Sequence, residues 1–409
     1  MFQKISGTCR VGQIRSVAFC DRDMWKCICL CAVIGLLSFG GYIYSDGGVF
    51  VLRDDFNSQQ IPFSTALNGA LKHWSGEWCW NVDLGTQLIG GYSFYNLGSP
   101  FFWISLLFHK NSFPYIVGIL YILKYITAGS TSYLYIKRFV SDSKYAVIGA
   151  LLYAFSGFQC ENLLFYHFHD VVAFFPLVLL GIERALKEKK HALFIFAVFL
   201  NCLVNYFFFV GEVIFLVLYF FCRFWDRPKD MLRNAVVCIA CGGVGVGMAS
   251  VLFLPSILFI SGNPRSELKI YLESLLPSPQ QVFYYLRGFL LPGEAMHDQS
   301  CIVKQSWPSA SCYLPLVGIS LPLAYVLKRR DWLVRLFLIL LGMAFSPLFS
   351  SAFYMFTNNY QRWWYMPILV MSVMSAVVLE RKDDFPVKRA VAVNALMVAL
   401  LFFALTRVR

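Results

Sequence analysis

The apolar run FPYIVGILYILKYITAGSTSYLYI, residues 113–136, contains 24 residues, of which only Lys124 is charged. A helix of about 20 predominantly apolar residues is long enough to cross the hydrocarbon core of a bilayer. The run therefore predicts a transmembrane helix, and comparable runs recur along most of the chain.

The composition supports a membrane protein. Of the 409 residues, 58% are apolar and 14% are charged, whereas a soluble domain carries roughly 25% charged residues. Too few charges are present to solvate a globule of this size, which excludes a soluble enzyme. The net charge of +12 fits the positive-inside bias of membrane proteins. No basic run with interleaved aromatic residues predicts binding to nucleic acid.

The apolar runs predict an all-α polytopic protein with about 11 transmembrane helices. Residues 1–26 form a basic cytoplasmic segment, and residues 27–406 form the transmembrane domain. The predicted spans lie near residues 27–45, 113–136, 145–159, 171–183, 191–204, 206–222, 234–260, 312–327, 332–349, 363–379 and 390–406.

The basic residues predict the orientation of these spans. With a cytoplasmic N-terminus, 24 of the 35 Lys and Arg residues fall in cytoplasmic segments, as the positive-inside rule requires. Two long extracytoplasmic loops result, residues 46–112 and 261–311, and we expect the functional site at this outer face of the cell membrane. Residues 98–108 are too short to cross and predict an interfacial helix or a re-entrant turn.

Two adjacent carboxylates, Asp54 and Asp55, follow the first predicted span, close to Gln59. A carboxylate at the bilayer edge is partly desolvated, which makes it a better proton acceptor. The pair is therefore a candidate general base. The alternative is an acidic, solvated start of a loop.

The stretch ENLLFYHFHD, residues 161–170, offers His167, His169 and Asp170 as ligand-binding side chains. These residue types could also chelate a divalent metal. The two histidines, however, would lie on opposite faces of a strand and are poorly placed on one helix face. We therefore predict no metal site, and the alternative is a set of interfacial side chains at the headgroup level.

Asn358 and Arg362 lie in the stretch TNNYQRWWY, residues 357–365, just before aromatic anchors. The fork of donors on an arginine suits phosphate oxygens, either of a lipid headgroup or of a substrate. Lys124 and Glu212 fall within predicted spans, where a charge is costly, and could pair with each other. So few intramembrane charges weigh against an ion or proton pathway.

An ordered set of motifs between about residues 46 and 380 resembles the YfhO family of bacterial membrane proteins. The motifs are Asp55, Gln59, Pro62 and Phe63, then Trp80 and Gly85, SPFF at 99–102, YAFSGF at 153–158, PLVLLGIER at 176–184, NYFF at 205–208 and QRWWY at 361–365.

That family is grouped with the GT-C glycosyltransferases, so the resemblance implies a GT-C-like fold. We expect no cofactor, and nothing in the sequence supports a divalent metal. It implies transfer of a sugar from a polyprenyl-phosphate carrier to a cell-envelope acceptor, such as lipoteichoic acid or another surface glycopolymer. Asp55 is the position that carries over as the catalytic base, with Asp54 beside it. Family members commonly carry an extracytoplasmic domain after the spans, which we expect this chain to lack.

A single base opposite the leaving group predicts an inverting reaction, by analogy with inverting glycosidases. Gln59, Arg362, His167, His169, Asp170 and Asn358 are then candidates for binding the substrate. A flippase or transporter is an alternative, favoured by the glycine-rich residues 241–247 if they break a helix. A non-catalytic membrane assembly protein is a third possibility.

The orientation gives the first testable prediction. In a background without reactive native thiols, Ser75→Cys should react with an impermeant thiol reagent added to intact cells, because the positive-inside rule places residues 46–112 outside. Labelling that requires permeabilised cells would reverse the topology and move the candidate base to the cytoplasm.

Overall fold

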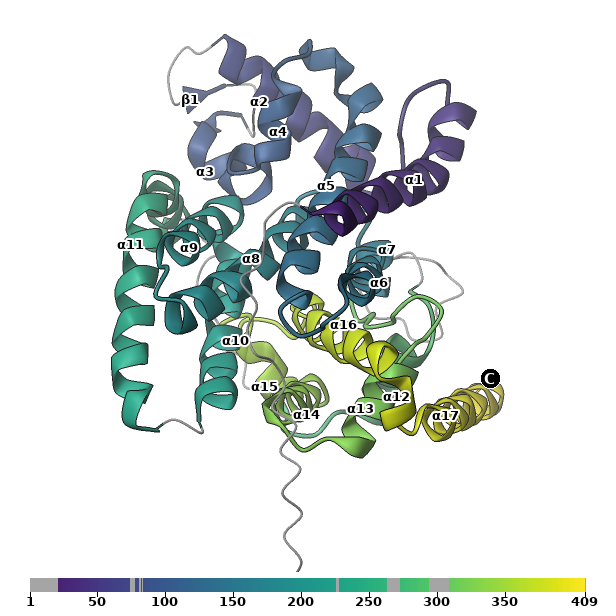
Figure 1. Ribbon diagram of the computed structural model, residues 1–409. Coiled ribbons are helices and arrows are strands. Elements are labelled where there is room, and N and C mark those ends of the chain that lie inside the picture. Colours follow the sequence, from purple (N-terminus) through teal and green to yellow (C-terminus); the bar gives the residue numbers. More distant parts are fainter. Residues whose placement is uncertain are drawn as a thin grey trace, which may run out of the picture.

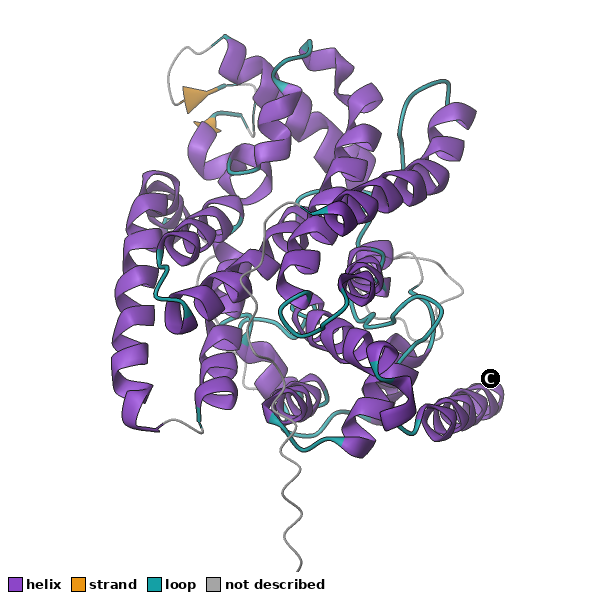
Figure 2. Ribbon diagram, in the orientation of Figure 1, coloured by secondary structure: helices purple, strands orange, loops and turns teal. Residues whose placement is uncertain are grey.

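The computed structural model describes residues 21–73, 78–80, 82, 84–225, 228–262, 273–293 and 309–408. This part of the chain is almost entirely helical (Figures 1 and 2), which confirms the predicted helical class. Its two strands, β1 (Trp78–Cys79) and β2 (Thr86–Gln87), form a short antiparallel pair in the first predicted outer loop.

Each stretch predicted as a span contains at least part of a helix, although the stretch 312–327 becomes helical only at residue 320. The helices are α1 (Arg22–Ser45), α5 (Phe113–Ile136), α6 (Ser143–Ala154) with α7 (Gly157–Glu161), α8 (Phe168–Lys187), α9 (Ala192–Val204), α10 (Tyr206–Phe224), α11 (Pro228–Ser261), α13 (Ser320–Lys328), α14 (Trp332–Ala344) with α15 (Pro347–Ala352), α16 (Tyr365–Glu380) and α17 (Val387–Val408).

The predicted outer loops also contain helices. The first carries a π-helical turn η1 (Phe56–Gln60), α2 (Ile61–Lys72), α3 (Leu88–Tyr92), a second π-helical turn η2 (Ser93–Leu97), α4 (Pro100–Ser105) and the 3₁₀ turn η3 (Lys110–Ser112). The second carries α12 (Pro279–Leu290), and the 3₁₀ turn η5 (Lys382–Asp384) precedes α17.

By length and composition, 5 helices of the described chain can cross a membrane: α1, α5, α10, α11 and α17. The chain is thus a membrane protein with several apolar helices. The total of about 11 transmembrane helices remains a prediction, because the helices in several predicted spans are interrupted. For example, α6 ends at Ala154 after 12 residues, which corresponds to about 18 Å, well short of a hydrocarbon core of about 30 Å.

Helices α5 and α16 form the interior of the bundle. Figure 1 shows α5 among α1, α6 and α8, and α16 is buried along residues 365–378. A helix that is apolar all round is expected to be buried on all sides. By contrast, α11 and α17 lie at opposite edges of the view and expose apolar side chains such as Ile239, Val251 and Phe403. These two helices therefore present the most lipid-compatible surfaces.

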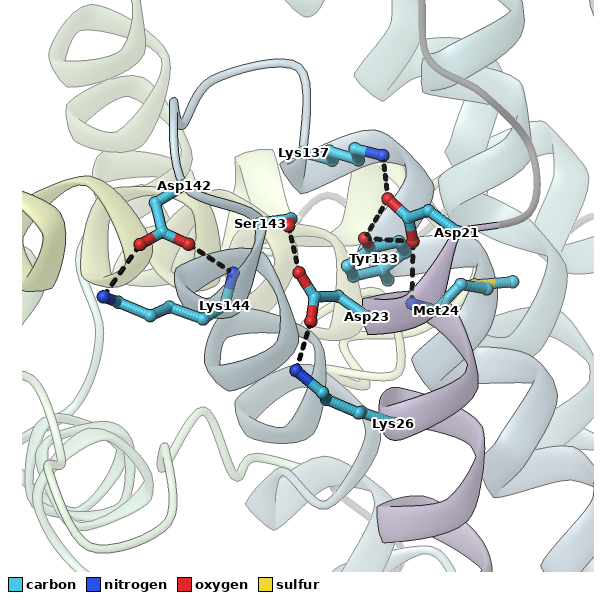
Figure 3. A network of polar contacts seen from close by, with 9 residues as sticks. All are labelled: Asp21, Asp23, Met24, Lys26, Tyr133, Lys137, Asp142, Ser143 and Lys144. Carbon is cyan, nitrogen blue, oxygen red and sulfur yellow. Dashed lines mark hydrogen bonds and ion pairs between the residues drawn. The ribbon is translucent and has the colours of Figure 1, made fainter.

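A polar network joins the beginning of α1 to the end of α5 and the beginning of α6 (Figure 3). Asp21 caps α1 and accepts a hydrogen bond of 2.8 Å from the Tyr133 hydroxyl while pairing with Lys137. Asp23 accepts a hydrogen bond from Ser143. These contacts hold together three helix ends that the charge pattern predicts to be cytoplasmic.

A buried ion pair joins α5 to α8. Lys124 Nζ lies 3.0 Å from Asp170 Oδ1, the two side chains are 0% and 1% exposed, and Lys124 also donates to the Tyr166 carbonyl at 2.7 Å. The suggestion that Lys124 pairs with Glu212 is therefore wrong. Glu212 lies on α10 and instead accepts a hydrogen bond of 3.1 Å from the Tyr365 hydroxyl on α16.

Removing one partner of this pair should destabilise the protein. Lys124→Met leaves a buried carboxylate without its cation, at a cost of roughly 3 to 5 kcal/mol. The double variant Lys124→Met, Asp170→Leu should recover much of the folded yield and thermal stability measured in detergent. The matched control is the double variant Lys124→Met, Glu212→Leu. It should recover neither the folded yield nor the thermal stability, because Glu212 does not pair with Lys124. Equal behaviour of the two double variants would contradict the assigned pairing.

Candidate functional site

The structure distinguishes the two adjacent carboxylates of the first loop. Asp54 is exposed and has a backbone φ of 52°, in the left-handed region that non-glycine residues rarely adopt. Asp55 is half-buried at the start of η1, and Gln59 Nε2 donates a hydrogen bond of 3.0 Å to its Oδ1. Asp55 is thus the partly desolvated, oriented member of the pair, as expected of a base.

The π-helical turn η1 brings an additional residue into the site. Such turns are rare and are frequently found at functional sites. One turn holds about 4.4 residues, so Gln59 and Gln60 both lie about one turn beyond Asp55. Gln60 is buried, and its Oε1 lies 3.2 Å from Nδ1 of His167. Sequence reasoning missed Gln60, and the only signal for it was its position directly after Gln59.

His167 directly precedes α8 and is buried among aromatic rings. Its ring centroid lies 4.7 to 5.2 Å from those of Phe94, Tyr95 and Phe168. Burial lowers the pKa of His167 well below its usual range, and the charges of Lys124 and Arg362 act in the same direction. The imidazole is therefore neutral. Since a neutral ring has one N–H, donation from Nδ1 to Gln60 leaves a lone pair on Nε2.

Arg362 contacts one of these rings, Phe168, from the segment before α16. Its Cζ lies 4.9 Å from the ring centroid of Phe168 and 5.3 Å from that of Phe165, and these two rings stack with 4.6 Å between centroids. The Phe168 ring thus contacts both Arg362 and His167. Cation–π contacts of this kind hold a guanidinium in place while leaving its donors open to an anion.

The first loop is fixed in this position by two close contacts near the end of α9. Asn205 caps α10 and donates a hydrogen bond of 2.9 Å to the Phe94 carbonyl. A Cβ atom on Gly98 would lie 1.8 Å from the Leu203 carbonyl oxygen, so only glycine fits there. Phe94 and Tyr95 are thereby held against His167.

Three predicted site residues have other surroundings. His169 Nε2 lies 3.1 Å from the Asn162 carbonyl, and its ring packs against Tyr121. Asp170 is paired with Lys124, and Asn358 is exposed and accepts a hydrogen bond from the neighbouring Asn359 backbone. Within the described residues, no three His, Cys, Asp or Glu side chains form a group that could hold a metal ion.

A second buried carboxyl connects α7 to the other outer loop. Glu161 accepts a hydrogen bond of 3.3 Å from the Tyr284 hydroxyl on α12. Burial raises the pKa of Glu161 to about 8, although the charge of Arg287 acts in the opposite direction. Next to it, the Ser309 hydroxyl donates to Asn162 Oδ1 at 2.6 Å. These contacts attach the second outer loop to the segment that leads to His167.

Gln60 contacts His167, and the Phe168 ring contacts both His167 and Arg362, although about 300 residues separate Gln60 from Arg362. We define Gln60, His167 and Arg362, together with Asp55, as the outer site, after the predicted outer loop that carries Asp55 and Gln60. It contains a half-buried carboxylate, a neutral imidazole and a cation, a set suited to moving a proton and binding an anion.

Comparison with known proteins gives the family. The chain matches the family described as "Bacterial membrane protein YfhO" over residues 28–408. It is 23% identical over 264 residues to "Uncharacterized protein YfhO" of Bacillus subtilis (strain 168), a match covering 63% of this chain and 28% of that relative. No solved structure matches. Because the family match runs from α1 to α17, the chain belongs to the YfhO family of bacterial membrane proteins.

Proposed function

We propose that this chain is a GT-C-type glycosyltransferase that moves a sugar from a polyprenyl-phosphate carrier to a cell-envelope acceptor on the outer face of the membrane. The observation that best supports this function is the connection made by η1. The half-buried Asp55 and the buried Gln60 share one π-helical turn, and Gln60 contacts His167 at 3.2 Å. The candidate base is therefore linked to His167, and the Phe168 ring beside His167 also contacts Arg362, the candidate phosphate-binding residue.

In the proposed reaction, an acceptor hydroxyl attacks C1 of the donor sugar and Asp55 takes the hydroxyl proton. The bond between C1 and the phosphate oxygen breaks, and polyprenyl phosphate leaves with the electron pair. Arg362 binds the phosphate and stabilises the charge that develops on it. A single displacement of this kind inverts the configuration at C1.

The transporter alternative expects broken helices near the middle of the membrane. In the structure, α11 continues without a break through the glycine-rich residues 241–247. A Cβ on Gly245 would lie within 2.8 Å of both Val198 and the Ile195 carbonyl of α9. Close packing against α9 accounts for this glycine, so the glycine-rich run does not favour transport.

Arg362 gives a prediction about binding. Lysine keeps the charge but not the planar fork that contacts two phosphate oxygens at once. Arg362→Lys should therefore weaken binding of a polyprenyl-phosphate sugar by about tenfold, measured with the purified protein in detergent. Lys382→Arg, at an exposed site on η5, is the matched control and should leave binding unchanged. If Arg362→Lys binds the donor lipid as tightly as the wild-type protein, Arg362 does not bind its phosphate through the guanidinium fork.

Asp55 gives a prediction about chemistry. Asparagine preserves the size of the side chain but cannot accept the proton, so Asp55→Asn should bind the donor lipid normally and lose about 10²-fold or more in transfer rate. Asp54→Asn is the matched control, because Asp54 is exposed, and should retain transfer. The measurement is transfer of a radiolabelled sugar by reconstituted protein.

The opposite pattern, with only Asp54→Asn inactive, would exchange the two roles. If neither change affects transfer by the folded protein, Asp55 is not the base. If wild-type protein binds the donor lipid without transferring its sugar to any tested acceptor, a transport or assembly function replaces the proposed one.

A further inference from the structure

Three buried polar atoms of the outer site have no hydrogen-bond partner among the described residues. They are Nε2 of Gln60, Nε2 of His167 and Nε of Arg362. Buried polar groups are nearly always hydrogen-bonded in native proteins, because an unmade bond costs free energy. Three such atoms around one aromatic cluster indicate a place where a ligand supplies the missing partners.

The chemistry of the three atoms restricts that ligand. Gln60 Nε2 and Arg362 Nε can only donate, whereas Nε2 of the neutral His167 can only accept. A bare anion would satisfy the two donors and leave His167 without a partner. A ligand that carries a hydroxyl donor close to its anionic oxygens, as a sugar attached to a phosphate does, can supply partners to all three atoms.

The surroundings of His167 fit a sugar better than a small polar molecule. The rings of Phe94 and Tyr95 lie 5.0 Å and 5.2 Å from the imidazole, centroid to centroid. Aromatic walls with a few placed polar groups are typical of sites that orient a small organic ligand. A sugar ring has an apolar face of C–H groups that can pack on such walls and hydroxyl groups at its edge.

We propose that His167 Nε2 accepts a hydrogen bond from a hydroxyl of the donor sugar, and that Gln60 is the positioning residue that keeps the N–H on Nδ1. This inference rests on the proposed function and adds a specificity residue to it. His167 makes the site prefer a polyprenyl phosphate that carries a sugar over one that does not. Arg362 contacts the phosphate that both lipids carry, so it does not itself recognise the sugar.

Two substitutions of His167 test the roles of its two ring nitrogens independently. In His167→Asn the amide can replace Nδ1 and keep the contact with Gln60, but nothing replaces Nε2. In His167→Gln the longer amide can place an acceptor near Nε2, but the contact at Nδ1 is lost. The probes are polyprenyl-phosphate glucose and polyprenyl phosphate, each titrated against the purified full chain in detergent. The quantity compared is the ratio of the two dissociation constants.

Wild-type protein should bind the sugar-bearing lipid more tightly. His167→Asn should lower that preference about tenfold, and His167→Gln should retain most of it. Gln60→Leu, which frees the proton to move to Nε2, should also lower the preference and covers the case in which His167→Asn does not fold. The controls are His109→Asn and His109→Gln. His109 is an exposed histidine in the first outer loop, which also contains Gln60, so both variants should leave the preference unchanged.

The remaining outcomes overturn the inference in distinguishable ways. If wild-type protein binds both lipids and His167→Asn keeps the preference while His167→Gln loses it, the histidine only supports Gln60, and the phosphate part of the proposed function still stands. If Gln60→Leu leaves the preference unchanged, Gln60 does not position the proton of His167 and the inference falls, while the phosphate part of the proposed function still stands. If wild-type protein binds neither lipid, the donor of the proposed function is wrong, and the role of His167 falls with it.

Discussion

The ion pair between Lys124 and Asp170 is the constraint to which the rest of the site is tied. A charge buried in a membrane protein has to be neutralised by a partner, and the pair does this at 3.0 Å with both side chains buried. Lys124 also binds the carbonyl of Tyr166, so α5 holds the chain on both sides of His167. The imidazole of His167 is thereby held with its Nδ1 toward Gln60 of the first outer loop. The Tyr121 hydroxyl of α5 adds a hydrogen bond of 2.6 Å to the Leu163 carbonyl, so the segment between α7 and α8 is attached to the centre of the bundle at two levels.

The first outer loop is positioned by a different kind of contact. Gly98 lets the backbone of the loop approach the end of α9, and the α10 cap Asn205 holds the Phe94 carbonyl. These are contacts of backbone with backbone or with a short amide, and they allow little adjustment. Together with the ion pair, they bring segments from three distant parts of the sequence to the outer site.

Much of this arrangement could be predicted from the sequence. The apolar run at residues 113–136 forms α5 with the same bounds, and each predicted span contains at least part of a helix. Hydropathy could not show where an apolar run is interrupted, as between α6 and α7. It also could not decide whether Lys124 pairs with Asp170 or Glu212, because that depends on which helices are neighbours. Asp55, His167 and Arg362 were selected by residue type, but Gln60 was missed because a π-helical turn does not follow the 3.6-residue period.

The π-helical turn η1 makes the outer site sensitive to chain length as well as to residue type. A π turn contains one residue more than an α turn, and each residue of an α-helix rotates the chain by about 100°. Deleting a single residue between Asp55 and Gln60 would convert the π turn into an α turn and keep the faces of the flanking residues nearly intact, but it would shift or remove the side chains, such as Gln59, that the turn places beside Asp55. Among relatives, a one-residue gap at this point would therefore mark a change of activity more clearly than many substitutions elsewhere in the loop.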